Sequence, residues 1–156
     1  MRYEPADSTL FMHNRSRLSA MLKPSSIGIL DSNDLMPTNA DGTLPWRQNS
    51  DLYYLSGIDQ EESTLLLFPD DADPSDREIL FIKETSEHIA IWEGQKLSKQ
   101  KATELSVIGN VQWNCQFDKV LERLTEQASH IYLNANEHPR ANITVQTRDV
   151  RLLKKC

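Results

Sequence analysis

The sequence predicts a soluble α/β domain, and three observations indicate this class. The first is the length of 156 residues, which is typical of one domain and is sufficient to bury a hydrophobic core. The second is the hydrophobic period, which changes along the chain from helical spacing to short apolar strands and back to helical spacing. The third is the shortness of the connections between the central strands, which favours antiparallel hairpins.

The first third of the chain predicts a helix, a strand and a long loop. Residues 9–22 predict the helix, because apolar side chains recur at helical spacing before Pro24 ends the pattern. These side chains are those of Phe11, Leu18 and Leu22. Residues 27–30 predict a buried strand. Residues 31–51 are rich in turn-forming residues, which predicts a long loop, and loops of this length are often functional.

Consecutive strands are predicted over the middle of the chain, at residues 52–55, 64–68, 78–82 and 88–92. The first is rich in aromatic residues and is closed by Gly57. In the last, alternation puts Ile89 and Ile91 on one face and Trp92 on the other. Trp92 then either lies at an interface or binding site, or is buried in a sheet that is covered on both faces, and the spacing leaves both alternatives open.

Helical periodicity returns after Gly94, and the last part of the chain predicts three helices and two short strands. Ser98 is predicted to cap the first of these helices, with Leu97 placed to contact Ala102. A second, amphipathic helix begins near Phe117, with Asn114 as its candidate cap. The strands are predicted at 111–113 and 131–133, and the last helix from about residue 140 onward.

Charge and composition exclude several classes of function. The chain holds 23 acidic and 17 basic residues, a net charge of −6, which is a poor basis for binding nucleic acid. Its apolar runs are far shorter than the roughly 20 residues that span a membrane, and no secretory signal is evident. The two cysteines, Cys115 and Cys156, show no pairing or metal-binding spacing. A reducing, cytoplasmic location is therefore expected.

The sequence contains no self-contained catalytic constellation. The histidines are not spaced as metal ligands, and no nucleophile elbow or phosphate-binding glycine loop is present. The densest acidic cluster consists of Asp70, Asp71, Asp73 and Asp76. It resembles an interrupted calcium loop, but Pro74 breaks the pattern, so a solvated hairpin turn is favoured.

The segment from Asp41 to Asp51 is more informative, because bulky, charged and amide side chains crowd into it. Arg47 is expected to hold either Asp51 or a loop carbonyl, and Asn49 is a natural turn or cap former. Asp41 lies in an Asp-Gly turn and has no further local structural role.

Residues 46–57, with the sequence WRQNSDLYYLSG, resemble the YRQNSDFxYLTG signature in the N-terminal domain of aminopeptidase P, the Xaa-Pro aminopeptidase family. Residues 90–94 together with Leu97 resemble a second family segment, EIWxGxxLG. Trp46 stands in place of the usual Tyr, and Glu93 occupies the variable position. The motif residues that the resemblance assigns to structure are Arg47, Gln48, Asn49, Ser50, Asp51, Gly57 and Gly94.

This resemblance implies a mixed, mainly antiparallel six-stranded sheet flanked by helices, as in creatinase and prolidase. It implies that residues 1–156 form one domain and that a catalytic pita-bread domain follows. In the family that second domain holds two metal ions, usually Mn²⁺, through two Asp, one His and two Glu. No catalytic or metal-binding residue is therefore expected in this fragment, and the fragment alone is expected to be inactive.

The resemblance also implies a role for this domain in building dimers or tetramers and in narrowing the entrance to the catalytic cleft. By alignment, Asp41 and Trp92 would reach the active site of a neighbouring subunit. The expected partners are the chain's own catalytic domain, further copies of the chain and proline-containing peptides. The alternatives are a stand-alone interaction module with the same fold and, less favoured, an autonomous hydrolase that uses Asp41 and Asp51 as a carboxylate pair.

Overall fold

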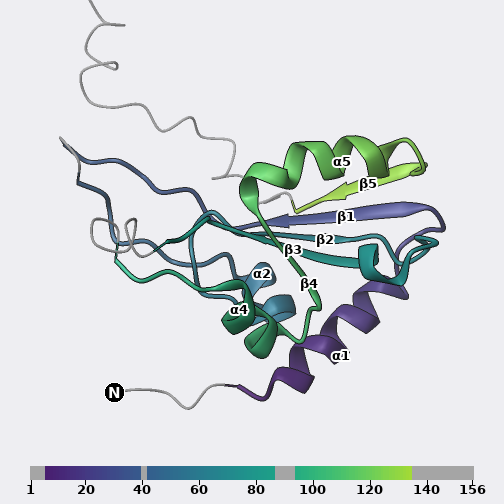
Figure 1. Cartoon of the computed structure of the whole chain (residues 1–156), viewed down its shortest axis with the longest axis horizontal. Helices are drawn as coiled ribbons and strands as arrows, with labels where there is room; N and C mark the ends of the chain where they lie inside the picture. The colour runs from purple at the N-terminus through teal and green to yellow at the C-terminus, as the bar shows by residue number, and fades with distance from the viewer. Residues whose placement is uncertain (1–5, 40–41, 87–93, 135–156) are drawn as a thin grey trace, which may run out of the picture.

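The computed structural model in Figure 1 describes residues 6–39, 42–86 and 94–134 of the chain. Asp41 and Trp92, the strand predicted at 88–92 and the helix predicted from residue 140 lie outside the described residues, as does Cys156. None of the helices in the described ranges is long and apolar enough to cross a bilayer.

The described residues form a five-stranded sheet with the order β4-β3-β2-β1-β5. The strands are β1 (Ser26–Asp31), β2 (Thr64–Leu67), β3 (Glu78–Ile82), β4 (Asn110–Trp113) and β5 (His130–Leu133). β2 pairs antiparallel with both β1 and β3, whereas the outer strands β4 and β5 pair parallel with their neighbours. The mixed sheet is thus confirmed. Its parallel and antiparallel pairings are equal in number among these strands, so the mainly antiparallel character is not confirmed, and the sixth strand stays a prediction.

Helices cover both faces of the sheet (Figure 1). On one face lie α1 (Ser8–Ser19), α2 (Ser50–Ser56) and α4 (Lys99–Ser106), and on the other lies α5 (Phe117–Thr125). Alternation along β2 divides the core, because Leu65 and Leu67 pack in the cluster that contains α2 and α4 residues, and Leu66 packs in the cluster below α5. Two short 3₁₀ turns, at Pro74–Asp76 and Asn114–Gln116, complete the described elements.

The strand predicted at 52–55 is wrong, because these residues form helix α2. The Asn49 side chain accepts hydrogen bonds from the backbone N–H groups of Asp51 and Leu52, which caps the start of the helix. Gly57 ends it in the left-handed conformation, with φ of 69°. Leu52 and Leu55 are buried three residues apart, so tertiary packing of one helical face outweighs the β-propensity of the aromatic pair between them.

Two predicted helix caps have different outcomes. Ser98 caps α4 as predicted, since its hydroxyl accepts the N–H of Lys101 at 3.1 Å. Asn114 does not cap α5, which begins at Phe117 without a side-chain cap. The Asn114 amide instead donates to the backbone carbonyl of Glu62, because β4 brings it next to the loop between α2 and β2.

Helix α1 is fastened to α2 by two buried polar side chains. Asn14 donates to the carbonyl of Tyr54 at 2.9 Å, and Arg15 donates to the carbonyl of Leu55 at 2.8 Å. Arg15 also pairs with Glu78 at the start of β3, at 2.9 Å. These bonds occupy carbonyls in the last turn of α2, and they make the two helices one packed unit.

Candidate functional site

Four of the five described strands end at the same edge of the sheet. The register pairs Asp31 of β1 with Thr64 of β2, and Thr64 with Phe81 of β3, so β1 and β3 end where β2 begins. The parallel strands β4 and β5 follow β3 and β1 and end there too. We call this side of the sheet the carboxyl edge. Loops that leave strands at one such edge lie close together, which makes the edge the natural place for a site.

Besides the connection from β4 to α5, three chain segments leave the sheet at the carboxyl edge, and two of them contain the positions singled out in the sequence. The segment after β1 includes position 41, and the segment after β3 includes position 92. The third segment continues beyond β5, from Asn134. Figure 1 shows the described parts of the first two segments extending from the same end of the molecule.

The segment after β1 contains a paired stretch, residues 36–39 and 42–44, which we call the finger. An isolated antiparallel bridge joins Pro37 to Thr43, and the N–H of Leu44 donates to the carbonyl of Met36 at 2.9 Å. Next to this bridge, the N–H of Thr38 donates to the carbonyl of Gly42 at 2.8 Å. The loop predicted to lack secondary structure is thus partly ordered by backbone pairing, and it exposes the apolar side chains of Met36 and Leu44.

Gln48 anchors the signature segment to the loop that follows α2. Its amide nitrogen donates to the carbonyls of Ile58 and Gln60, at 3.0 and 2.9 Å. Its amide oxygen accepts the N–H of Asn49 at 2.7 Å. Both ends of the side chain are therefore used, which explains an amide at this position better than a charged or apolar side chain would.

A series of hydrogen bonds, most of them donated by side-chain amides, joins the segments after β1 and β5 to each other and to the start of α2. The indole N–H of Trp46 donates to the carbonyl of Asn33 at 2.8 Å, and the Asn33 amide donates to the carbonyl of Arg47 at 3.0 Å. The Asn134 amide donates to the side-chain oxygen of Asn49 at 3.2 Å. Trp46, which replaces the usual Tyr, keeps a polar hydrogen and uses it here.

The predicted contact of the Arg47 side chain does not occur among the described residues. The Arg47 guanidinium is exposed, and neither Asp51 nor a loop carbonyl accepts from it there. Asp51 lies in the first turn of α2, where the helix dipole favours a negative charge. Ser50 is the first residue of that helix, and Asn49 before it takes the predicted cap role.

The segment that follows position 92 is held by the loop between α2 and β2. Lys96 forms an ion pair with Glu61, and the N–H of Leu97 donates to the side-chain oxygen of Gln60 at 2.7 Å. Burial by itself would raise the pKa of Glu61, but the hydrogen bond from Lys96 and the charges of Lys96 and Lys83 hold that pKa below its ordinary value. Gly94, with φ of 79°, adopts the left-handed conformation that glycine favours.

These anchoring contacts were not foreseen from the sequence. Glu61 and Lys96 lie 35 residues apart, and Gln60 and Leu97 lie 37 apart. No local pattern links residues at such separations, because the contacts depend on the antiparallel pairing of β2 with β3. The only local signal was the amide-rich composition of the signature segment.

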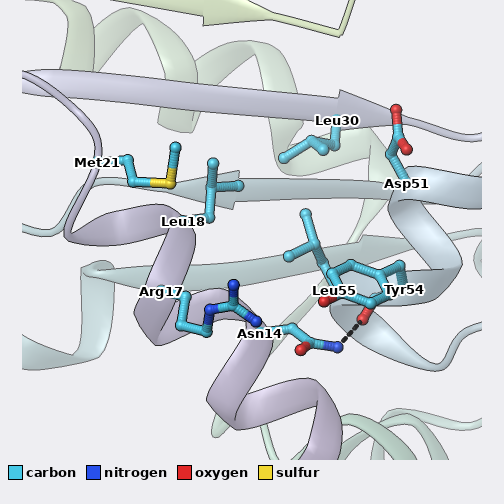
Figure 2. Close-up of a pocket in the computed structure, with 8 residues that line it drawn as sticks. All are labelled: Asn14, Arg17, Leu18, Met21, Leu30, Asp51, Tyr54 and Leu55. Atoms are coloured by element: carbon cyan, nitrogen blue, oxygen red, sulfur yellow. Dashed lines mark hydrogen bonds between the residues drawn. The ribbon is translucent and has the colours of Figure 1, made fainter.

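A groove lies between α1 and α2 beside the carboxyl edge, with a volume of about 320 Å³ (Figure 2). Its floor is apolar and includes Leu18, Leu30 and Leu55. Arg17 from α1 and Asp51 from α2 also line it. This groove was not predicted, since it exists only where two helices and a strand meet.

The acidic cluster is a hairpin turn between β2 and β3, as predicted. Asp70 accepts the N–H of Ser25 at 2.7 Å, and Asp71 and Asp73 accept N–H groups within the turn. Asp76 pairs with Arg123 at 2.8 Å. Across the described ranges, no group of three or more His, Cys, Asp and Glu side chains is arranged to hold a metal ion.

Comparison with known proteins identifies the family to which this chain belongs. The sequence model of the family described as "Aminopeptidase P, N-terminal domain" matches residues 11–132 of the chain. The Xaa-Pro aminopeptidase of Escherichia coli is 25% identical over 92% of this chain, and that of Haemophilus influenzae is 25% identical over 78%. The chain spans about a third of the length of these relatives, 32% and 28% respectively.

Solved structures agree with the sequence comparisons. A putative aminopeptidase P from Bacillus anthracis matches with a TM-score of 0.76 and 27% identity, over 95% of this chain and 35% of that one. The aminopeptidase PepP of Pseudomonas aeruginosa shares the fold with a TM-score of 0.75 and 24% identity, over 95% of this chain and 31% of the other. Family pattern, relatives and fold coincide over the same region, and the chain belongs to the family of aminopeptidase P N-terminal domains.

Proposed function

We propose that this chain is the assembly and gating half of a Xaa-Pro aminopeptidase, the enzyme class that removes an N-terminal residue ahead of proline. Catalysis belongs to a second domain that follows residue 156 in the whole protein. The domain described here supplies walls and subunit contacts. The names of the relatives support the enzyme class, and their greater length leaves room for a catalytic domain.

The observation that carries this proposal is the convergence of three segments at the carboxyl edge. The segments with positions 41 and 92 start from the same edge as the chain that continues past Asn134. Because that continuing chain leads toward the proposed catalytic domain, both segments start on the side from which it is reached. Asp41 and Trp92 are proposed to form part of the wall of a neighbouring subunit's active site.

The structure of the described segments supports gating, because they are anchored at their bases. Gln48 and Asn33 hold the residues that follow the finger, and Lys96 and Leu97 hold the residues that follow position 92. A wall residue needs such support, since a site tolerates little displacement of its contacts. The amide network is therefore proposed to position the two loops rather than to contact substrate.

The metal ions of the enzyme, expected to be two Mn²⁺, are proposed to lie wholly in the catalytic domain. The described residues of this chain do not fit a metal site, because their carboxylates are used in turns, caps and ion pairs rather than gathered around one point. The cytoplasmic location and the single-domain boundary at residue 156 remain predictions from the sequence. The stand-alone module is not favoured, since the relatives that carry this domain are longer enzymes.

The central test uses the whole protein, loaded with Mn²⁺, and the substitutions Trp92→Ala and Asp41→Ala. Each is expected to lower kcat/KM for an Xaa-Pro peptide by about tenfold or more, because a wall residue contributes to substrate positioning. The metal content is expected to stay unchanged. Glu126→Ala is the matched control, because Glu126 is exposed at the far end of α5 from the carboxyl edge. Unchanged kinetics in both wall variants would contradict the gating role.

A second test separates this proposal from an autonomous hydrolase. The chain of residues 1–156, purified alone and supplied with Mn²⁺, is expected to show no Xaa-Pro hydrolysis. Turnover that survives repeated purification and disappears in Asp41→Ala or Asp51→Ala would instead support the carboxylate pair. The DNA sequence beyond codon 156 distinguishes the stand-alone module, which requires a stop codon there.

A further inference from the structure

The loop of residues 58–63, between α2 and β2, contacts both segments that contain the proposed wall positions. Because β2 begins at the carboxyl edge, this loop reaches the sheet between the ends of β1 and β3. Ile58, Gln60 and Ser63 are buried, so the loop is packed into the fold. We call it the α2–β2 loop, and its burial makes it a fixed support for the segments around it.

The segment after β1 is held by the α2–β2 loop at both of its ends. At its start, the N–H of Ser32 donates to the carbonyl of Ser63 at 2.8 Å, and the N–H of Ser63 donates to the Ser32 hydroxyl at 3.1 Å. At its end, the Gln48 amide donates to the carbonyls of Ile58 and Gln60. The segment that includes position 41 therefore leaves from this loop and returns to it.

The segment after β3 is held by the same loop, again at both ends. Lys83, directly after β3, pairs with Glu62 at 3.0 Å. Where the segment returns, Lys96 pairs with Glu61, and the N–H of Leu97 donates to the Gln60 side-chain oxygen at 2.7 Å. Position 92 lies between these contacts in the sequence. One loop thus closes the bases of both segments.

Gln60 contacts the returning ends of both segments, because its main-chain carbonyl accepts from Gln48 and its side-chain oxygen accepts from Leu97. We propose that the α2–β2 loop positions the two wall segments together, with Gln60 as the positioning residue that links them. The inference rests on the proposed function, because its effect on hydrolysis requires Asp41 and Trp92 to be wall residues. Gln60 itself acts through these segments and does not contact substrate.

The environment of Gln60 favours a positioning role over a contribution to stability. The residue is 4% exposed, yet among the described residues no acceptor lies within hydrogen-bond distance of its side-chain nitrogen. A buried donor without an acceptor lowers the stability of a fold. A methionine would fill the same space without this cost, so stability alone does not explain a glutamine here. The oxygen that it offers to Leu97 does explain it.

The first test is Gln60→Met in the whole protein, loaded with Mn²⁺. We expect KM for an Xaa-Pro peptide to rise about fivefold or more at nearly unchanged kcat, because displaced walls lose contacts with bound substrate. Unfolding in urea is expected to change little, since the unpaired donor disappears when Leu97 loses its acceptor. In Trp92→Ala, Gln60→Met is expected to have little further effect, because the displaced side chain is then absent. An unchanged KM, or equal effects in both backgrounds, would overturn the proposal.

Ser56 and Ser106 provide a matched pair that tests the loop as a whole. Each is fully buried, donates its hydroxyl to the carbonyl four residues earlier at 2.7 Å, and accepts the N–H two residues later at 3.1 Å. Ser56 holds Ile58 of the α2–β2 loop, whereas Ser106 holds Ile108, just before β4 at the opposite edge. Ser56→Ala and Ser106→Ala are expected to destabilise the fold equally, but only Ser56→Ala is expected to raise KM. Equal KM values would contradict the positioning role.

Hydrogen exchange tests the shared support independently of activity. Ser56→Ala is expected to speed amide exchange in both segments, residues 32–49 and 83–97, because both lose the same support. Ser106→Ala is expected to speed exchange in neither. Faster exchange in only one segment of Ser56→Ala would show that the two are positioned separately, which would overturn the proposal.

The wall variants separate this inference from the proposed function. If Asp41→Ala and Trp92→Ala lower kcat/KM while Gln60→Met and Ser56→Ala leave KM unchanged, the inference fails and the proposed function stands. If exchange rises in both segments of Ser56→Ala but neither wall variant changes the kinetics, the proposed gating function fails and the shared support stands.

Discussion

The two ends of the sheet are held by different chemistry. At the carboxyl edge, neutral amides of Gln48, Asn33 and Asn134 donate to main-chain or side-chain oxygens of other loops. At the opposite edge, the turn between β2 and β3 is held by carboxylates, with Asp71 and Asp73 each accepting an N–H two residues further on. The hydrogen bonds at the carboxyl edge join distant segments, whereas the acidic turn combines the local bonds of Asp71 and Asp73 with contacts from Asp70 and Asp76 to distant residues.

This difference distinguishes a positioned site from a connection. Local carboxylate bonds shape a turn without placing it relative to the rest of the molecule, which suits a link between two strands. Hydrogen bonds from side-chain amides to distant segments fix several loops relative to one another, which is what a wall of an active site requires. The side-chain amides are also neutral, so the strength of their hydrogen bonds is not expected to change with pH.

Among the substitutions that test this comparison, Gly57→Ala is expected to lower the free energy of unfolding most. Gly57 has φ of 69°, and a Cβ there would lie 2.3 Å from the Phe11 ring, so the substitution combines backbone strain with a clash in the core. We expect a loss of about 3 kcal/mol or more in the free energy of unfolding, measured by urea titration. Gly109, just before β4 at the opposite edge, is the control, because a Cβ there meets nothing within 4 Å. A loss below about 1 kcal/mol in Gly57→Ala would show that Phe11 moves aside freely.

A smaller effect is expected from Gln48→Ala, which removes all three bonds of the anchoring amide. Partly buried carbonyls at Ile58 and Gln60 lose their donor, so we expect a loss of about 2 kcal/mol, again by urea titration. Gln100→Ala is the matched control, because the exposed Gln100 makes only one long bond, of 3.4 Å, to Glu104. Equal stability of both variants would mean that the amide network does not anchor the signature segment.

The smallest effect is expected from the ion pairs, and it depends on pH. The lowered pKa of Glu61 means that its pair with Lys96 stabilises the fold above the ordinary value of 4.5, and that this contribution is lost as pH falls through the lowered pKa. Compared with Glu61→Gln, the unmodified protein is expected to be about 1 kcal/mol more stable at pH 7 and to lose this advantage toward pH 3.

A comparison of thermal unfolding at several pH values measures this effect. Arg123→Ala, at the opposite edge, is the control, because Arg123 is 48% exposed in its pair with Asp76, whereas the side chains of Lys96 and Glu61 are 17% and 16% exposed. We expect a change of about 0.5 kcal/mol or less that diminishes with salt. An advantage over Glu61→Gln that does not vary with pH would contradict the role of the Glu61 charge.

Elements with a clear hydrophobic period were predictable, and α2 was not. The apolar runs of β1, β2 and β3 and the spacing of Val120 and Leu124 in α5 are local patterns, so they predicted those elements closely. Residues 52–55 are equally compatible with a strand and a helix when taken alone. The Asn49 cap and the burial of Leu52 and Leu55 against the sheet decided between them.

The candidate site likewise has features that the sequence predicted and features that only the structure revealed. The signature segment, and with it the family, could be identified from the sequence because a motif is a run of neighbouring residues. The order of the strands, the meeting of three segments at the carboxyl edge and the groove with Arg17 and Asp51 on its rims could not be. Those features depend on contacts between residues far apart in the chain, and only the packing of helices against a twisted sheet brings such residues together.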